Sequence, residues 1–351
     1  MSDSIPSAGI TSTTYDVVIS GVVTAVPRNV VTNDDFASRF SATDIANVAK
    51  MIGVKERRRV SAGQTTADLC EAAARELLRD LHWSANDVGL LIFVSQSPDY
   101  VLPATACVLQ ARLGLPTQCA SFDVNLGCSG YVYGLWMASS LMASTNVNRA
   151  LLLVGDAGYY NDPLDRATAM VFGDAGSATA LTRSSSTQPW RFVLGTDGRG
   201  ANNLIVHKSG TRQATPDDPR LSGRDPTKLF MDGGEIFNFT LSAVPPLAAQ
   251  LFGNTAAIAN YDAFLFHQAN AFMIKHLAKK IKLDPARVPL NMERFGNASS
   301  ASIPLLMSDV LAPLLTSKNL RLALFGFGVG YSWAAADITC GPLESAKVIE
   351  L

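Results

Sequence analysis

The sequence predicts an α/β protein made of two similar halves, each with the order β-α-β-α-β-β. The first observation is an internal repeat, in which two apolar runs are each followed by a helix, a turn and a second helix. The second is that each half closes with two more strand-like runs. The third is the length of 351 residues, which suits two units of roughly 100–200 residues each. The matching strand pairs are 87–96 with 261–268, 149–155 with 320–326, and 176–181 with 331–338.

The boundary between the halves is expected in a polar segment. Residues 184–189 are rich in serine and threonine, a composition typical of a connection between packed units. The prediction is therefore an N-terminal half at 1–184 and a C-terminal half at 185–351.

In the first half, the apolar strand at 120–125 runs into the turn at 126–129 and then into a helix that begins at Gly130. This turn carries Cys128. Backbone N–H groups and the helix dipole at such a turn favour a thiolate, and they also supply donors for an oxyanion. Cys128 is thus a candidate nucleophile, although a small buried cysteine fits the same position.

In the second half, His267 follows the apolar strand at 263–266 and precedes a helix. Catalytic residues gather at the carboxyl ends of strands in open α/β sheets, and a nucleophilic thiol needs a base or donor nearby. The other three histidines of the chain lack this placement. We therefore expect His267 either to act in catalysis or to be a buried structural histidine.

Asn297 lies in a run of small residues between a strand-like segment at 288–292 and a helix-like segment at 305–311. Small residues permit close approach of a substrate, and the amide of Asn297 is able to donate to a carbonyl oxygen. A helix cap is the competing interpretation. In the repeat, the Asn297 turn is the equivalent of the Cys128 turn, so packing of the halves about a pseudo-twofold axis would bring both turns into one cleft.

From Asp16 to Ile338 the chain resembles the thiolase superfamily, and within it the β-ketoacyl-acyl-carrier-protein synthase III group. The resemblance depends on several motifs in the family's order. They are DVNLGCSG at 123–130, DPLDR at 162–166, FGDAGSA at 172–178, HQAN at 267–270, GNASSASIP at 296–304 and GVGYSW at 328–333.

The resemblance implies a five-layered α/β/α/β/α subunit, a homodimer and a pantetheine tunnel that leads to the cysteine. It also implies a Cys128–His267–Asn297 triad. In that chemistry Cys128 takes an acyl group from a thioester, with N–H groups at Cys128 and near Val329 holding the oxyanion. A malonyl thioester on acyl carrier protein then loses carbon dioxide, and neutral His267 and Asn297 donate to the enolate oxygen. No metal or other cofactor is needed, because coenzyme A or phosphopantetheine thioesters are the substrates.

The sequence departs from the family where coenzyme A is held. The usual tryptophan and arginine before the GVKER segment at 53–57 are Asn47 and Met51 here, and the arginine after HQAN is Phe272. Arg166 in the DPLDR motif is kept. Loss of this aromatic–guanidinium clamp favours a carrier-protein donor, and with it a specialised fatty-acid or polyketide-type pathway.

Acyl-chain length is expected to depend on the packing of a few large side chains. Leu102 matches a family position that reaches across the dimer into the partner's acyl pocket. Phe172 and Phe272 are expected to contact the substrate together with Arg166. The other side chains expected to set the pocket depth are Tyr131, Trp136 and Phe237.

Composition excludes several classes of protein. The net charge of −1 gives no signature of binding to nucleic acid or anionic membranes, and no apolar run reaches the roughly 18 residues of a membrane helix. Five cysteines without CxxC spacing suit a reducing cytoplasm. The basic run at 55–59 has two interpretations, a docking patch for an acidic carrier protein or a solvated strand.

Three functions remain open. A decarboxylating condensing enzyme is favoured, because both His267 and Asn297 are in place. A thiolase-fold acyltransferase that moves an acyl group from Cys128 to a hydroxyl or amine is the first alternative. A non-catalytic partner subunit is the second, although such a subunit has no need of Cys128.

Overall fold

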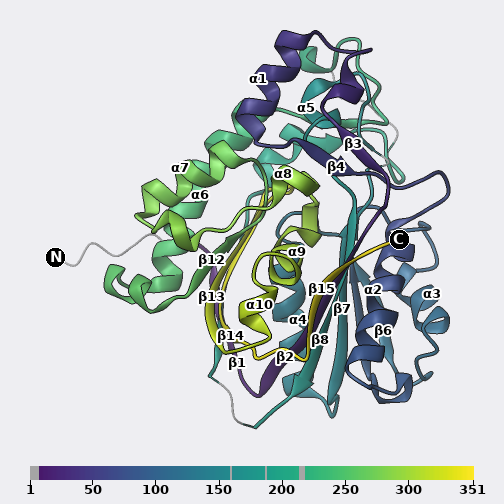
Figure 1. The fold of residues 1–351 in the computed structure, drawn as a ribbon, viewed down its shortest axis with the longest axis vertical. Coiled ribbons are helices and arrows are strands. Elements are labelled where there is room, and N and C mark those ends of the chain that lie inside the picture. Colours follow the sequence, from purple (N-terminus) through teal and green to yellow (C-terminus); the bar gives the residue numbers. More distant parts are fainter. Residues whose placement is uncertain (1–7, 159, 186–187, 213–217) are drawn as a thin grey trace.

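In the computed structural model, which describes residues 8–158, 160–185, 188–212 and 218–351, two sheets are packed with helices between and outside them (Figure 1). The six-stranded sheet has the order β15-β2-β8-β7-β5-β6, and the five-stranded sheet has the order β1-β9-β14-β13-β12. The strands of the first are β15 (Ser345–Glu350), β2 (Val17–Val26), β8 (Ala175–Arg183), β7 (Arg149–Asp156), β5 (Leu90–Val94) and β6 (Ala120–Val124). Those of the second are β1 (Ile10–Thr14), β9 (Trp190–Thr196), β14 (Ser332–Cys340), β13 (Leu320–Gly328) and β12 (Ala263–Phe266).

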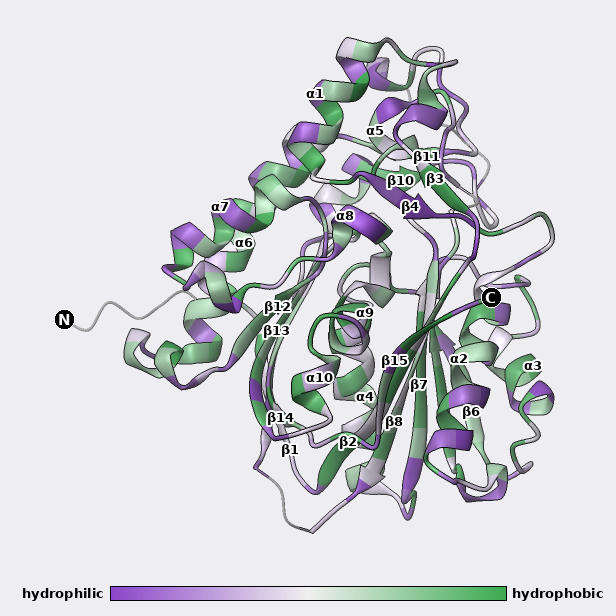
Figure 2. Ribbon diagram, viewed as in Figure 1, coloured by the Kyte–Doolittle hydropathy of each residue, from purple (hydrophilic) through white to green (hydrophobic). Residues whose placement is uncertain are grey.

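The helices form three layers around these sheets. α4 (Gly130–Ser144) and α9 (Ser302–Ser308) lie between the sheets, α2 (Thr66–Asp80) and α3 (Thr105–Arg112) cover the outer face of the first sheet, and α6 (Gly233–Phe252) and α7 (Ala271–Ile281) cover that of the second (Figure 1). Hydrophobic residues concentrate along the strands, whereas the outer helices carry both kinds of residue (Figure 2). The predicted five-layered α/β/α/β/α fold is therefore confirmed.

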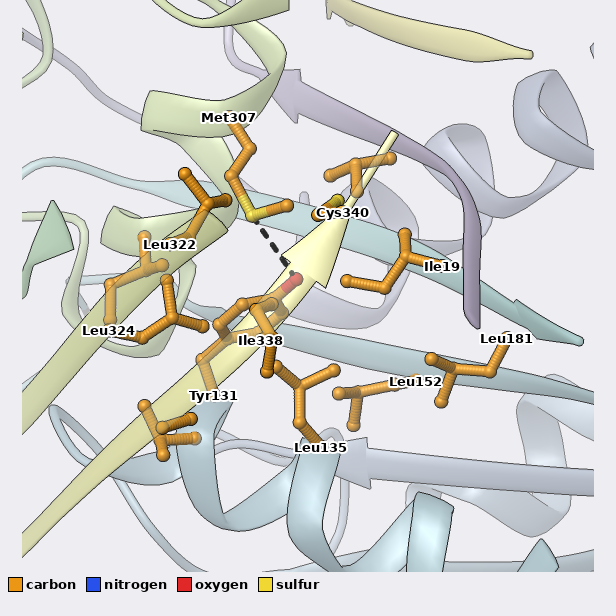
Figure 3. Packing of buried hydrophobic residues seen from close by; sticks show 14 of the residues in the cluster. Ile19, Tyr131, Leu135, Leu152, Leu181, Met307, Leu322, Leu324, Ile338 and Cys340 are labelled. Atoms are coloured by element: carbon orange, nitrogen blue, oxygen red, sulfur yellow. Dashed lines mark hydrogen bonds between the residues drawn. The ribbon is translucent and has the colours of Figure 1, made fainter. Parts of the chain in front are cut away.

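The core between the sheets joins the two halves. Tyr131 on α4 is buried there, and its hydroxyl lies 3.2 Å from the Thr179 hydroxyl and 3.6 Å from the sulfur of Met307 on α9 (Figure 3). Burial of leucine, isoleucine and aromatic side chains in this layer supplies about 1.5–3 kcal/mol each. Because residues of both sheets share the layer, the halves stabilise each other.

Each end of the chain adds a strand to the sheet that is formed mainly by the opposite half of the sequence. β1 at the N-terminus pairs with β9 of the second sheet, and β15 at the C-terminus pairs in parallel with β2 of the first. The predicted division after residue 184 stays a prediction, and residues 186–187 of the expected connection lie outside the described residues. Each sheet nevertheless depends on a strand from the opposite end of the sequence.

One predicted element differs. The segment 288–292 is not a strand, and the chain instead forms the short helix α8 (Met292–Phe295) before the Asn297 turn. Pro289 lacks the N–H that a paired strand must donate, which explains why β12 remains an edge of its sheet.

The helix ends follow ordinary capping chemistry. Thr65 and Asp68 form a capping box at the start of α2, where the Asp68 amide donates to the Thr65 hydroxyl. α1 (Ala42–Ile52) ends at Gly53, whose φ of 77° is a left-handed conformation that glycine adopts without strain. These residues determine where α2 begins and where α1 ends.

Small elements complete the chain. The paired strands β3 (Val30–Thr32) with β4 (Glu56–Arg58), and β10 (Leu204–Val206) with β11 (Leu229–Met231), lie beside α1 and α5 (Arg166–Ala169) (Figure 2). α10 (Ala312–Leu315) follows α9. Short 3₁₀ turns occur at Asp34–Phe36, Ala85–Asp87, Gly198–Asn203, Pro219–Leu221, Thr255–Asn260, Pro285–Arg287 and Ser299–Ala301. Among the described residues, no helix combines the length and apolar character needed to cross a membrane.

Candidate active site

The Cys128 turn, His267 and the Asn297 turn line one cavity between the two halves. The sulfur lies against the end of β13, where a Cβ on Gly328 would stand only 2.8 Å from it. On the other side, Asn297 forms an isolated bridge with Phe172, in which its N–H donates to Val171 O at 2.9 Å and its carbonyl accepts from Gly173 at 3.0 Å. The structure thus brings together the turns that the repeat predicts to be equivalent.

Cys128 is held as a neutral thiol. Burial is the largest influence and, with the nearby Asp156 carboxylate, raises the pKa of Cys128 to about 12. The N–H groups of Val329 and Cys128 itself point at the sulfur and act in the opposite direction. The expectation that the turn favours a thiolate is therefore wrong for the unliganded protein, because desolvation outweighs the backbone donors.

His267 is neutral as well. It follows β12, is 2% exposed, and burial lowers its pKa to about 4. Its Nδ1 lies 3.2 Å from the Ser299 carbonyl oxygen, an acceptor that requires the ring proton on Nδ1. In this tautomer Nε2 carries the lone pair, so the ring is suited to accept a proton there.

The two ends of the Asn297 side-chain amide have different surroundings. Its side-chain oxygen accepts a hydrogen bond from Ser299 N at 2.9 Å, which leaves its NH₂ group as the part available to a ligand. Asn297 is 5% exposed and lines the cavity. The side-chain oxygen thus binds the first N–H of the 3₁₀ turn Ser299–Ala301, as a capping residue does, and the role of the NH₂ group as a donor stays a prediction.

Ser299 connects the three residues. With φ at 46° it occupies the left-handed region, which is costly for a serine and persists only where neighbouring contacts hold it. This conformation directs its carbonyl to His267 and its N–H to Asn297, while its hydroxyl hydrogen-bonds to the Cys128 sulfur. Nothing in the sequence distinguishes Ser299 from the other small residues of the run, so its role was not predicted.

Asp156 was also missed. It ends β7, its side chain is half-buried and forms no ion pair among the described residues, and desolvation raises its pKa. The only signal in the sequence is a carboxylate at the carboxyl end of an apolar strand, a position that the same analysis used for His267. The oxygens of Asp156 accept from Gln96 N at 2.7 Å, Ser95 Oγ at 3.1 Å, Ser97 Oγ at 3.4 Å and Ser300 Oγ at 3.4 Å, and the Ser299 hydroxyl hydrogen-bonds to Asp156 as well.

The expected substrate contacts divide into two groups. Arg166, Phe172 and Phe272 line the cavity, which has a volume of about 1270 Å³. Arg166 forms an ion pair with Asp44 on α1. Leu102 is 81% exposed and does not line the cavity within the described part of this chain.

The aromatic residues expected to set pocket depth also divide. Phe237 lines the cavity and stacks on Phe272 with 5.8 Å between ring centroids. Tyr131 and Trp136 instead pack in the core between the sheets. Their expected contact with the acyl chain is therefore not formed within this chain.

The basic run at 55–59 is not a free patch. Arg57 is fully buried and donates to Val31 O and Met170 O, so the docking interpretation is wrong for it. The other cations of the run are paired, in Lys55–Glu293 at 2.5 Å, Arg58–Glu350 at 2.7 Å and Arg59–Asp174 at 3.4 Å. Among the described residues, no three His, Cys, Asp or Glu side chains are grouped to hold a metal ion.

Comparisons with known proteins agree on one family. Residues 122–198 match 3-oxoacyl-[acyl-carrier-protein (ACP)] synthase III, and residues 252–340 match the family's C-terminal part. A solved structure of a 3-oxoacyl-(acyl-carrier protein) synthase from Burkholderia xenovorans is 49% identical, with a TM-score of 0.95 and coverage of 98% of this chain and 99% of the other. The β-ketoacyl-[acyl-carrier-protein] synthase III 2 of Streptomyces coelicolor is 34% identical over 340 residues, which cover 94% of this chain and 96% of the relative. The corresponding enzyme of Clostridium beijerinckii is 31% identical over 322 residues, with coverage of 91% and 98%.

Proposed function

The chain belongs to the 3-oxoacyl-[acyl-carrier-protein] synthase III family, and we propose that it condenses an acyl group held on Cys128 with a malonyl group on acyl carrier protein. The observation that carries this proposal is the placement of Cys128, His267 and Asn297 on one cavity, with an unprotonated Nε2 on the histidine. The enzyme is thus an acyl-transferring condensing enzyme whose substrates are thioesters and which needs no cofactor.

In the first step Cys128 attacks the carbonyl carbon of an acyl thioester while its proton passes to Nε2 of His267. The oxyanion that forms accepts hydrogen bonds from the N–H groups of Cys128 and Val329, which already point at the sulfur. Collapse of the intermediate breaks the carbon–sulfur bond to the donor, whose thiolate takes the proton back from His267. Cys128 and His267 are both neutral near neutral pH, which supports a proton transfer concerted with attack.

In the second step a malonyl thioester loses carbon dioxide and leaves an enolate, whose oxygen accepts a hydrogen bond from the Asn297 amide. His267 joins as a second donor only in the tautomer with its proton on Nε2, at the cost of the bond to Ser299. The enolate carbon attacks the acyl carbonyl and expels the Cys128 thiolate, which takes one proton from solvent. The product is a β-ketoacyl thioester on carrier protein.

The mouth of the cavity supports a carrier-protein donor in a specialised pathway. Asn47 and Met51 on α1 and Phe272 on α7 line it, where the typical coenzyme-A-primed relative has a tryptophan and two arginines. Met51 and Phe272 are 56% and 55% exposed, so they offer an apolar rim without a guanidinium to meet the nucleotide phosphates. Arg166 of the DPLDR motif, a further arginine of such relatives, is kept in this chain and is paired with Asp44.

A homodimer completes this function. Val101 and Leu102 are 90% and 81% exposed on a loop next to the cavity, and β6 is an edge strand of its sheet. Apolar exposure of this size beside an open sheet edge is typical of a protein–protein interface. Sedimentation or light scattering at micromolar concentration is expected to give twice the chain mass, and Leu102→Asp is expected to lower it.

The five free cysteines suit a cytoplasmic location.

Intact-protein mass spectrometry tests the activity. The wild type and Cys128→Ala are incubated with acyl-carrier-protein and coenzyme A thioesters, and malonyl-carrier protein is then added. Condensation predicts an acyl adduct on the wild type alone, followed by its loss as a β-ketoacyl product. An adduct that survives malonyl addition but leaves with a hydroxyl or amine acceptor would favour the acyltransferase, and no adduct from any donor would favour the non-catalytic subunit.

A further inference from the structure

The wall of the cavity changes character between its mouth and its floor. The lining from α1, α6, α7 and the β10–β11 hairpin is largely apolar. The lining from the carboxyl ends of β5, β6 and β7 and the loops that follow them is mixed, with Pro98, Val101 and Ala157 among its apolar residues. It also brings a group of polar side chains to the side of the cavity that holds Cys128, namely Ser95, Gln96, Ser97, Asp123, Asn125, Asp156 and Asn161. A plain alkyl chain on Cys128 would lie against polar groups, which is unfavourable unless they are satisfied within the protein.

Most of these polar groups are satisfied within the protein. Both oxygens of Asp123 accept backbone N–H groups, from Thr105 and Ala106 at 2.7 Å each. Asp156 accepts from Gln96 N and from the hydroxyls of Ser95, Ser97, Ser299 and Ser300, so it needs no further partner. The wall therefore does not call for a charged group on the substrate.

Three side-chain amides are exceptions, those of Gln96, Asn125 and Asn161, and Nδ2 of Asn161 is buried without a partner among the described residues. Of the three, Gln96 is the one that lies against Gly127, next to Cys128. Within the described residues its side-chain amide takes part in no hydrogen bond, although its backbone N–H is fixed on Asp156 at 2.7 Å. Its carboxamide oxygen packs against Gly127, so closely that no Cβ would fit there, and Gly127 precedes the nucleophile directly. The amide is thus half-buried, held in place and unpaired, at the floor of the cavity beside the acyl site.

We infer that Gln96 selects the acyl group, and that the preferred donor carries a neutral hydroxyl near its thioester. The inference depends on the proposed function. An amide both donates and accepts, which matches a hydroxyl, whereas an alkyl chain leaves both capacities unpaired. A carboxylate is disfavoured, because the Asp156 carboxyl lies in the same wall.

The test measures acylation of Cys128 by intact mass spectrometry, with carrier-protein thioesters of butyrate, of 2-, 3- and 4-hydroxybutyrate, and of succinate. The wild type is expected to react faster with at least one hydroxybutyryl donor than with butyryl, by about tenfold, which is the scale of one hydrogen bond. Gln96→Met keeps the length of the side chain and removes the amide, so the preference should disappear. Gln118→Met, an exposed position outside the cavity, is the matched control and should keep it.

The possible results distinguish a failure of this inference from a failure of the proposed function. Equal or faster reaction with butyryl in the wild type, or an unchanged preference in Gln96→Met, overturns the inference and leaves the condensing activity intact. No acylation by any thioester overturns both. Gln96→Asn, which shortens the amide by one methylene, is expected to give an intermediate preference and guards against misfolding of the methionine variant.

Discussion

At the scale of single residues, the proposed nucleophile and base rest as two neutral groups. Burial holds the pKa of Cys128 at about 12 and that of His267 at about 4, so neither ionises near neutral pH in the unliganded protein. An enzyme with a preformed thiolate–imidazolium pair would react with any electrophile. In this site the proton is expected to pass from Cys128 to His267 only when a substrate is bound.

Alkylation of Cys128 by iodoacetamide is therefore expected to speed up with pH and to show no plateau below about pH 11. The physical reason is that the thiolate, which is the reactive form, remains a small fraction until the pH approaches the raised pKa. Rates are measured by intact mass under excess reagent. A plateau near pH 7 would mean that an ion pair exists in the resting site.

The buried His267 also links stability to pH. Its pKa of about 4 in the folded chain is below the ordinary histidine value of 6.5, so the unfolded chain binds a proton first as the pH falls. Its contribution is complete above about pH 6.5 and is lost progressively toward pH 4, on the order of 3 kcal/mol in total. Urea unfolding at several pH values is expected to show this slope in the wild type and a shallower one in His267→Gln. If the free energy of unfolding changed with pH equally in the wild type and in His267→Gln, this contribution of His267 would be contradicted.

At the scale of elements, Asp156 connects three segments of the chain through hydrogen bonds. It ends β7, accepts from residues after β5, and accepts from Ser300 in the turn that carries Asn297. One carboxyl thus sets the relative positions of the loop that bears Gln96 and the turn that bears the proposed donor. It is a positioning residue, and its charge also acts on Cys128.

Asp156→Asn is expected to lower the pKa of Cys128 and to move the alkylation profile toward lower pH, because the neighbouring negative charge is removed. The substitution also replaces an acceptor with a donor that faces hydroxyl groups, so the melting temperature should fall. Asp34→Asn, at an exposed turn, is the control and should change neither property. A profile that moves to higher pH would refute the electrostatic role of Asp156.

The sequence predicted the elements that have a strong local signal. The apolar strands, the Cys128 turn and the position of His267 after a strand follow from periodicity and from the repeat, and the structure has them in place. The strand expected at 288–292 failed because Pro289 has no N–H to donate to a neighbouring strand, and the apolar side chains of Val288, Leu290 and Met292 pack into the hydrophobic core instead. Ser299 and Asp156 act through a backbone angle and through burial, and neither can be read from residue type.

At the scale of the whole molecule, the halves are tied by the shared core and by the exchange of β1 and β15. Burial of Tyr131, Ile303 and Leu324 in one cluster requires both sheets to be present. The predicted boundary after residue 184 divides the sequence into two units, but each unit depends on the other for its stability.

Fragments 1–184 and 185–351, expressed separately, are expected to be insoluble or molten, since each exposes one face of the common core and lacks one edge strand. Co-expression should restore a folded complex with a single thermal transition, as seen by circular dichroism and calorimetry. A fragment that unfolds cooperatively by itself would show that its half is independent. Deletion of 345–351 alone should lower the melting temperature, because β15 pairs with β2 along six residues.

The position of β15 also bears on how the chain is made. A ribosome releases the N-terminal half long before it finishes Ser345–Glu350, so β2 must wait with an open edge for nearly the whole of synthesis. During that wait the edge is a template for pairing with another nascent chain. Slow translation, or a shortage of chaperones, is therefore expected to reduce the yield of this protein more than that of one whose sheets close in the order in which they are synthesised.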